Sequence, residues 1–324
     1  MAAIGENIEV PSRGPGSSSE RRTSERGVSV VIPTLNRGRE VCQTIDELLK
    51  LGNPPAEIVV VDQTPQYAEP YQSRLNALAR EGKINRLRLP KPHVTRAMNQ
   101  GLLRATRDIV LFLDDDIHFD TELVYRHLEA HDGDTFAVVG RVIQPWHSNE
   151  PDQQRFDKRN PEKFEFNSEE SQRVTRVMAG NLSVNRKQAI AIGGFDENFV
   201  AAAYRFEAEF AQRACDAGLA IQYSPAAAIY HLKSEQGGIR KFGNHLTNLM
   251  PSHNVGQYYY LLRTRSGCGR VAAIALNPFR AVSTRFHARN PWWVPVTLIS
   301  EILGLLWALR LSSRGPRRIM LEEN

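Results

Sequence analysis

The chain of 324 residues is poor in cysteine, and its N-terminus has no long apolar segment. Cys42, Cys215 and Cys268 lie far apart and fit no metal-binding spacing, which argues against a cysteine-ligated metal centre. We therefore expect free thiols in a reducing cytoplasm. The N-terminus also lacks the apolar core of a secretory signal peptide, so we expect no such signal.

Lysine is absent between Arg263 and Arg318, and Glu301 is the one acidic residue of that stretch. Arginines are frequent there, and the whole chain has a formal net charge of +5. An arginine-rich segment favours an anionic or phosphate-rich partner. No nucleic-acid-binding motif accompanies the charge, so we expect no nucleic acid partner.

Apolar runs alternate with amphipathic stretches along most of the chain. Residues 12–26 contain no large apolar residue, so residues 1–26 are predicted to form a disordered tail. The alternation beyond them predicts a doubly wound α/β sheet. Strands are expected at 28–33, 57–62, 84–89, 109–113, 136–142, 174–184, 220–223 and 228–231. Helices are expected at 38–51, 67–81, 95–105, 186–192 and 206–217, and a long loop at 145–171.

Three consecutive aspartates, Asp114, Asp115 and Asp116, follow the apolar run at 109–113. The run is typical of a buried strand in a parallel sheet, and ligands of open α/β sheets bind beyond the carboxyl ends of the strands. Adjacent carboxylates repel one another unless a cation lies among them. A divalent cation that carries a phosphate therefore suits this position. Alternatively, the aspartates cap the following turn or helix.

Several segments between Val28 and Leu232 resemble, in order and spacing, the family-2-type glycosyltransferases of the GT-A fold. They read VSVVIPTLNR, EIVVVDQ, HVTRAMNQGLLRATRDIVLFLDDD and AGNLSVNRKQAIAIGGFDENF. The resemblance implies a Rossmann-like, doubly wound mixed sheet in a catalytic domain at 27–240. Residues 241–324 would form a helical, arginine-rich C-terminal extension.

The resemblance implies a nucleotide diphosphate sugar as donor and Mg²⁺ or Mn²⁺ as cofactor. Asp116 would bind the metal, with His231 as a second ligand from a later strand. The donor would be bound by the loop and strand-end residues Pro33, Thr34, Asn36, Arg37, Asp62, Arg96, Asp114 and Asp115.

The catalytic base is expected on the helix at 206–217. Family members usually have Glu-Asp, then Asp two residues later, then an arginine on the same helix. Alignment on Arg213 places Glu207 at the base position and Glu209 at the following acid, so Glu207 is the expected base and Glu209 the alternative. Asp196, in the Gly-Gly-Phe-Asp-Glu turn, is expected to contact the acceptor.

The C-terminal extension contains an apolar helix, predicted at 296–309, with tryptophans before it and arginines after it. Its modest length and Glu301 argue against a membrane span. Residues 291–318 instead suit an interfacial helix on anionic lipid. The alternative is a helix packed on the protein itself or in a dimer.

The sequence therefore predicts a metal-dependent, inverting glycosyltransferase that builds a cell-surface glycan or glycolipid. It would be cytoplasmic, with a possible peripheral position on the inner face of the plasma membrane. Its acceptor would be a glycan or a lipid-linked molecule. Two alternatives stay open: a transferase that acts on a polyprenyl phosphate, and a degenerate protein that binds sugar nucleotides without catalysis.

Overall fold

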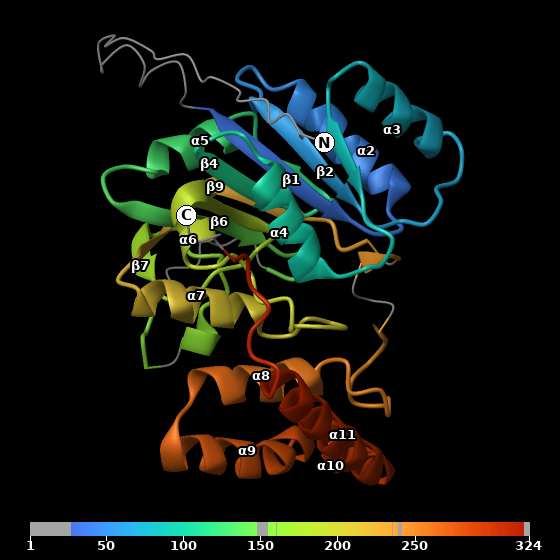
Figure 1. The fold of residues 1–324 in the computed structure, drawn as a ribbon, viewed down its shortest axis with the longest axis vertical. Helices are drawn as coiled ribbons and strands as arrows, with labels where there is room; N and C mark the ends of the chain where they lie inside the picture. Colours follow the sequence, from blue (N-terminus) through green and yellow to red (C-terminus); the bar gives the residue numbers. More distant parts are fainter. Residues whose placement is uncertain (1–26, 148–154, 160, 235, 239–241, 321–324) are drawn as a thin grey trace, which may run out of the picture.

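The computed structural model describes residues 27–147, 155–159, 161–234, 236–238 and 242–320. The predicted tail at 1–26 and the predicted domain boundary at 240–241 lie outside the described residues. Figure 1 shows a twisted sheet with helices on both faces and a layer of C-terminal helices beneath it. Nine strands of the described chain belong to this one sheet.

The first half of the sheet is parallel, with strand order β3-β2-β1-β4. Its strands are β1 (Val28–Thr34), β2 (Glu57–Asp62), β3 (Asn85–Arg88) and β4 (Ile109–Leu113). The connecting helices are α2 (Gly38–Leu49), α3 (Tyr71–Arg80) and α4 (Val94–Arg104). Because the carboxyl ends of parallel strands meet at one edge, Thr34 and Asp114 come to that edge together. This half agrees with the sequence prediction.

The second half of the sheet is mixed and continues the order as β8-β6-β9-β5, with β7 also paired to β9. Its strands are β5 (Ile117–Phe119), β6 (Thr135–Ile143), β7 (Gln172–Val174), β8 (Asn181–Asn185) and β9 (Ala220–His231). The strand predicted at 174–184 is in fact the end of β7 and most of β8. The two strands predicted at 220–223 and 228–231 are one strand, whose ladder to β6 shifts register between Gly140 and Arg141. Pro225 lies in the shifted part, where it can donate no ladder hydrogen bond.

Helices cover both faces of the sheet, and apolar side chains fill the space between the layers. The remaining helices of this part are α5 (Leu123–Ala130), α6 (Arg186–Ala191) and α7 (Phe206–Asp216), with a 3₁₀ turn at Pro161–Lys163. The sequence prediction missed α5 and β5, which follow the three aspartates.

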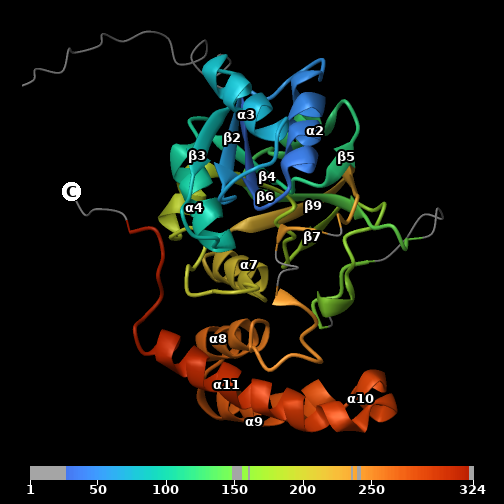
Figure 2. The same cartoon turned by 90° about the vertical axis from the view of Figure 1, so that its right-hand side faces the viewer.

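The C-terminal layer contains α8 (Asn254–Thr264), α9 (Gly267–Val282), α10 (Arg285–Arg289), a 3₁₀ turn (Pro291–Trp293) and α11 (Val294–Ser312). Figure 2 shows α8 against α7, with α9 and α11 farther from the sheet. The helical stretch Pro291–Ser312 has 22 residues and a mean hydropathy of 1.6 in its most apolar window. By length and composition it could cross a membrane, so the predicted helix at 296–309 was too short.

Helix α11 packs its polar stripe, rather than its apolar face, against the protein. Its buried residues are Thr297, Ser300, Glu301, Gly304 and Ala308. The carboxylate of Glu301 accepts hydrogen bonds from Tyr258 Oη at 2.6 Å and Asn277 Nδ2 at 2.7 Å. A charged side chain can be buried here because both neighbours donate to it. The opposite, apolar side of α11 is exposed.

Candidate functional site

A cavity of about 500 Å³ opens at the carboxyl edge of β1 and β4, a size typical of small-molecule sites. Most of the predicted site residues line it: Pro33, Thr34, Arg37, Asp114, Asp115, Asp116, Glu207 and His231. They come from strand ends and helices that are far apart in sequence. The sheet order places them around one space.

Asp115 is held by the first loop of the chain. Its carboxylate accepts hydrogen bonds from Thr34 Oγ1 at 2.6 Å and from an Arg37 guanidinium nitrogen at 2.7 Å. Burial raises the pKa of Asp115 to about 7, although the charge of Arg37 and these hydrogen bonds act in the other direction. Arg37 therefore offsets part of the negative charge of the three aspartates.

Asp116 and His231 meet where β9 ends. His231 Nε2 lies 3.3 Å from Asp116 Oδ1, and its Nδ1 lies 3.2 Å from Gln144 Oε1. In a neutral ring, donation from Nδ1 to this amide oxygen leaves the lone pair on Nε2, the arrangement used by metal-binding histidines. Burial would raise the pKa of Asp116, but His231, Arg37 and the Ser234 amide outweigh it and hold the pKa below its ordinary value.

Asp114, Asp116 and His231 fit a divalent cation. Each offers a ligand atom, and these atoms lie within 4.8 Å of one another. Asp116 Oδ1 is buried and accepts no hydrogen bond from the described residues, although a nitrogen of Arg37 lies 2.9 Å away. Carboxylate oxygens suit Mg²⁺, and the added imidazole suits Mn²⁺. The residues present thus match the predicted cofactor.

Gly180, the residue before β8, lets the backbone there approach Asp114 closely. A Cβ built on Gly180 would overlap the Asp114 carboxylate. The Asp114 amide also donates to Gly180 O at 3.2 Å. Burial raises the pKa of Asp114, with the charge of Asp116 adding to it and those of His231 and Arg37 opposing it. A cation at this position would relieve the repulsion between the two carboxylates.

Glu207 enters the same cavity from the first turn of α7. Its Oε1 accepts a hydrogen bond from the Ala179 amide at 2.5 Å. Burial raises the pKa of Glu207 to about 7, helped by the charge of Asp114 and opposed by the Ala179 amide and Arg176. A carboxyl group that gains and loses its proton near neutral pH is suited to general-base catalysis.

Three predicted donor residues do not line the cavity. Asp62 is fully buried, and its carboxylate accepts hydrogen bonds from the Thr64 amide, Tyr67 Oη and the fork of Arg86. Asn36 is exposed, has a left-handed φ of 56° and donates its amide to Thr64 Oγ1. Arg96 is exposed on α4. Asp62 shapes the loop after β2, and direct donor contacts by these three residues remain predictions.

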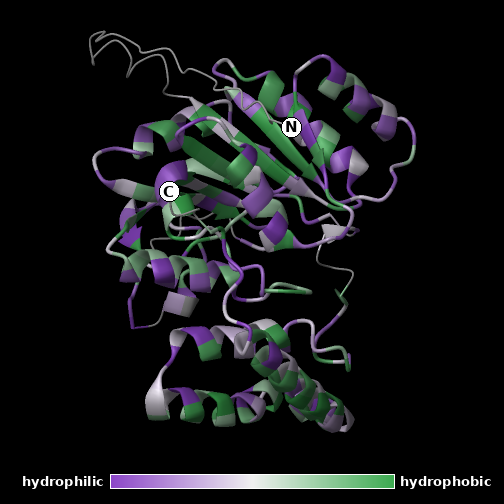
Figure 3. Ribbon diagram, in the orientation of Figure 1, coloured by the Kyte–Doolittle hydropathy of each residue, from purple (hydrophilic) through white to green (hydrophobic). Residues whose placement is uncertain are grey.

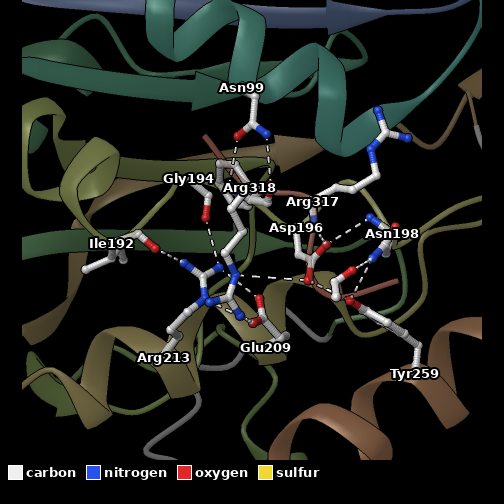
Figure 4. Close-up of polar contacts among 12 residues, drawn as sticks. Asn99, Ile192, Gly194, Asp196, Asn198, Glu209, Arg213, Tyr259, Arg317 and Arg318 are labelled. Carbon is white, nitrogen blue, oxygen red and sulfur yellow. Dashed lines mark hydrogen bonds and ion pairs between the residues drawn. The ribbon is translucent and has the colours of Figure 1, made fainter. Parts of the chain in front are cut away.

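Glu209 and Asp196 also lie away from the cavity, in a buried polar cluster shown in Figure 4. Glu209 accepts hydrogen bonds from Arg213 at 2.8 and 3.0 Å and from Arg318 at 2.7 Å. Asp196 accepts from Tyr259 Oη at 2.8 Å and from two backbone amides at 3.0 Å. Both carboxylates are saturated by protein donors. The geometry therefore favours Glu207 over Glu209 as base, and a contact between Asp196 and an acceptor stays a prediction.

Sequence reasoning missed the supporting residues of the site. Gln144 hydrogen-bonds the ring of His231, and the Ala179 amide donates to Glu207. Gly180 has no side chain and so leaves room for the Asp114 carboxylate. Ala179 and Gly180 lie in the AGN motif that carried the resemblance. Gln144 follows β6 directly and had no signal of its own in the sequence.

The glycosyl transferase family 2 model matches residues 29–193 of this chain. No curated protein matches this chain in sequence. A mannosyltransferase from Pyrobaculum calidifontis, solved with GDP-Man and Mn²⁺, aligns over 86% of this chain and 87% of its own, with a TM-score of 0.51 and 15% identity. S. aureus TarS 1–349, solved with UDP-GlcNAc, aligns over 89% of this chain and 92% of its own, with a TM-score of 0.51 and 13% identity.

Glucosyl-3-phosphoglycerate synthase from Mycobacterium tuberculosis aligns over 78% of this chain and 86% of its own, with a TM-score of 0.50 and 15% identity. At such identities the likeness concerns the fold, and it confirms the predicted GT-A architecture with a C-terminal helical extension. The family model covers just over half of the chain, from β1 to the end of α6. The chain therefore belongs to glycosyl transferase family 2.

Proposed function

We propose that this protein transfers a sugar from a nucleotide diphosphate sugar to a hydroxyl group, with inversion at the anomeric carbon. The observation that carries the proposal is the placement of Glu207 in one cavity with the cation-binding group Asp114, Asp116 and His231. Structural neighbours solved with GDP-Man, UDP-GlcNAc and Mn²⁺ support the donor class and the metal.

Glu207 acts as the general base in this mechanism. The acceptor hydroxyl oxygen forms a bond to the anomeric carbon, and its proton passes to the Glu207 carboxylate. The bond from the anomeric carbon to the diphosphate oxygen breaks, and the nucleotide diphosphate leaves with the electron pair. A cation held by Asp114, Asp116 and His231 would supply charge stabilisation for that leaving group. Arg37 adds a fixed positive charge at the same edge of the sheet.

The test compares Glu207→Gln with Glu129→Gln, an exposed change on α5. Wild type is first screened by thermal shift against UDP- and GDP-sugars, with and without Mn²⁺, and donor turnover is then measured. We expect Mn²⁺-dependent stabilisation by one donor class, and loss of turnover in Glu207→Gln alone. Full turnover in Glu207→Gln would refute the base assignment. Stabilisation without any turnover would favour the degenerate binding protein.

We further propose that the acceptor is lipid-linked and that the C-terminal layer rests on the inner face of the plasma membrane. The exposed side of α11 is apolar and includes Ile299, Ile302, Leu303 and Leu306. Figure 3 shows how much of α11 is hydrophobic. Its polar residues are buried against α8, the reverse of the pattern in a water-exposed helix. A solvated apolar face of this length is unfavourable in water, and a bilayer would cover it.

Helix α9, which contacts α11, also exposes apolar side chains. None of its described residues is buried, and Val271, Leu276 and Phe279 are exposed. Trp292 lies in the 3₁₀ turn just before α11 and is 65% exposed, as suits a residue at the lipid headgroups. The arginines of residues 263–318 complement anionic lipid. Because α8 packs along one side of α11, the helix suits a position in one leaflet rather than an isolated span.

Vesicle sedimentation tests this surface. We expect wild type to sediment with phosphatidylglycerol vesicles, and the double change Ile302→Asp and Leu306→Asp to abolish sedimentation. Leu103→Asp, at an exposed leucine of α4, is the matched control and should behave as wild type. A wild type that stays in the supernatant and elutes as a dimer would assign the face to a second copy and refute the lipid proposal. A polyprenyl phosphate acceptor fits the same surface and would be tested as a substrate in these vesicles.

A further inference from the structure

The chain does not end at the apolar helix but returns to the catalytic domain. After α11, residues 315–320 run back without helix or strand, as Figure 2 shows. We call this segment the strap. The Glu197 amide donates to Arg317 O at 2.7 Å, and the Ile319 amide donates to Gly193 O at 2.9 Å. The strap is thus bound through its backbone to the turn after α6.

The two glycines of that turn leave room for the strap, because they have no side chains. Gly193 and Gly194 have φ values of 88° and 60°, which disfavour any other residue. A Cβ on Gly194 would lie 2.6 Å from Ile319 Cδ1, and one on Gly193 would lie 3.0 Å from Arg318 Cβ. The strap therefore packs directly against the Gly-Gly-Phe-Asp-Glu turn. Asp196, in this turn, accepts a hydrogen bond from the Arg317 amide.

Arg318 reaches from the strap to the helix that carries Glu207. One of its terminal nitrogens donates to Glu209 Oε1 at 2.7 Å, and the Glu209 side chain is 3% exposed. Arg213 completes the cluster by donating to Glu209 and to the carbonyl of Gly194. Figure 4 shows both guanidinium groups converging on Glu209. Hydrogen bonds between charged groups are among the stronger ones in proteins.

The start of α7 depends on such outside contacts. Ala201, Ala203 and Arg205, which lead into the helix, all have left-handed φ values between 49° and 73°. Non-glycine residues hold this conformation only where surrounding contacts impose it. The residue before the helix, Arg205, makes no side-chain cap. The Glu207 carboxylate therefore takes its position from contacts beyond its own segment.

We propose that Arg318 is a positioning residue, which acts through Glu209 to hold the first turn of α7 so that Glu207 faces the reacting hydroxyl. The inference rests on the proposed function of Glu207. The donor side of the cavity is built by β1, β4 and β9, none of which contacts Arg318 in an observed hydrogen bond or ion pair. Loss of the Arg318 charge is therefore expected to slow the chemical step and to leave donor affinity unchanged.

The test uses the full chain with Arg318→Met, which keeps the aliphatic stem and removes the charge. Arg317→Met is the matched control, because the neighbouring Arg317 side chain is 63% exposed and lies 3.4 Å from Glu197. Donor turnover, donor affinity with Mn²⁺ and hydrogen exchange of the α7 amides are measured for each. We expect kcat of Arg318→Met to fall by about tenfold to a hundredfold, as for other small misplacements of a reacting group. Donor Kd should be unchanged, and Arg318→Lys should restore most of the loss.

Hydrogen exchange separates this proposal from the proposed function. Faster exchange in the first turn of α7 in Arg318→Met, but not in Arg317→Met, supports the strap contact even if no donor is turned over by wild type. An active wild type with equal kcat and equal exchange in Arg318→Met would overturn the inference. A loss of donor affinity equal to the loss of kcat would overturn it as well, because it would indicate a general structural effect.

Discussion

Replacing Glu207 by glutamine is expected to stabilise the protein while it stops catalysis. The pKa of Glu207 is about 7 in the folded chain, against an ordinary value of 4.5. Keeping this carboxylate ionised at pH 8 therefore costs about 3 kcal/mol of folding free energy. Because the folded-state pKa is the higher one, the free energy of unfolding falls as pH rises from 4.5 to 7.

Glutamine keeps the oxygen that accepts from the Ala179 amide and removes the charge. Urea denaturation without divalent cation should therefore show Glu207→Gln more stable than wild type by about 3 kcal/mol at pH 8, with little gain near pH 4.5. Turnover should fall by roughly 10²- to 10⁴-fold. Glu129→Gln should change neither quantity. A stability gain of the same size at both pH values, or no gain at pH 8, would refute the reasoning.

Three further substitutions test the site. Gln144→Leu removes the amide oxygen beside His231 Nδ1, and Mn²⁺ affinity in calorimetry should fall about 10- to 100-fold; unchanged affinity would show that the ring needs no such partner. Gly180→Ala would place a methyl group on the first carboxylate of the aspartate triplet, so Mn²⁺ binding should be lost with an unchanged circular dichroism spectrum. Asp62→Asn would leave the buried guanidinium of Arg86 without its anionic partner. Urea denaturation should then show a loss of about 3–5 kcal/mol, and an unchanged midpoint would contradict the ion pair's importance.

The place of the three aspartates at the cavity could be predicted because short-range patterns determine it. An apolar run such as β4 indicates a buried strand, and the carboxylates that follow it must lie at the edge where the parallel strands end. The same reasoning places Thr34 at the end of β1 and Asp62 at the end of β2. It does not say whether an acid faces the cavity. The Asp62 carboxylate accepts hydrogen bonds from Tyr67, in the loop after β2, and from Arg86 on β3.

The surroundings of Glu207 and Glu209 could not be predicted, because residues distant in sequence determine them. Glu207 and Glu209 both lie in the first turn of α7, and the sequence places them two residues apart with similar chemistry. Their different surroundings depend on Ala179 for one and on Arg318 for the other. Helix α11 gave a similar result. The sequence shows an apolar helix there, but it does not show that α8 covers the side with Thr297, Ser300 and Glu301.

The strap also bears on how this protein folds. The contact between Glu209 and Arg318 joins residues 109 positions apart in sequence. Contacts at such separation carry a large loop-closure entropy and form late in folding. The helices α8 to α11 precede the strap in the chain, so all of them must be synthesised before the strap can reach the turn at Gly193. During synthesis α7 therefore emerges well before Arg318, and a chain that is still without its strap lacks this contact at the start of α7.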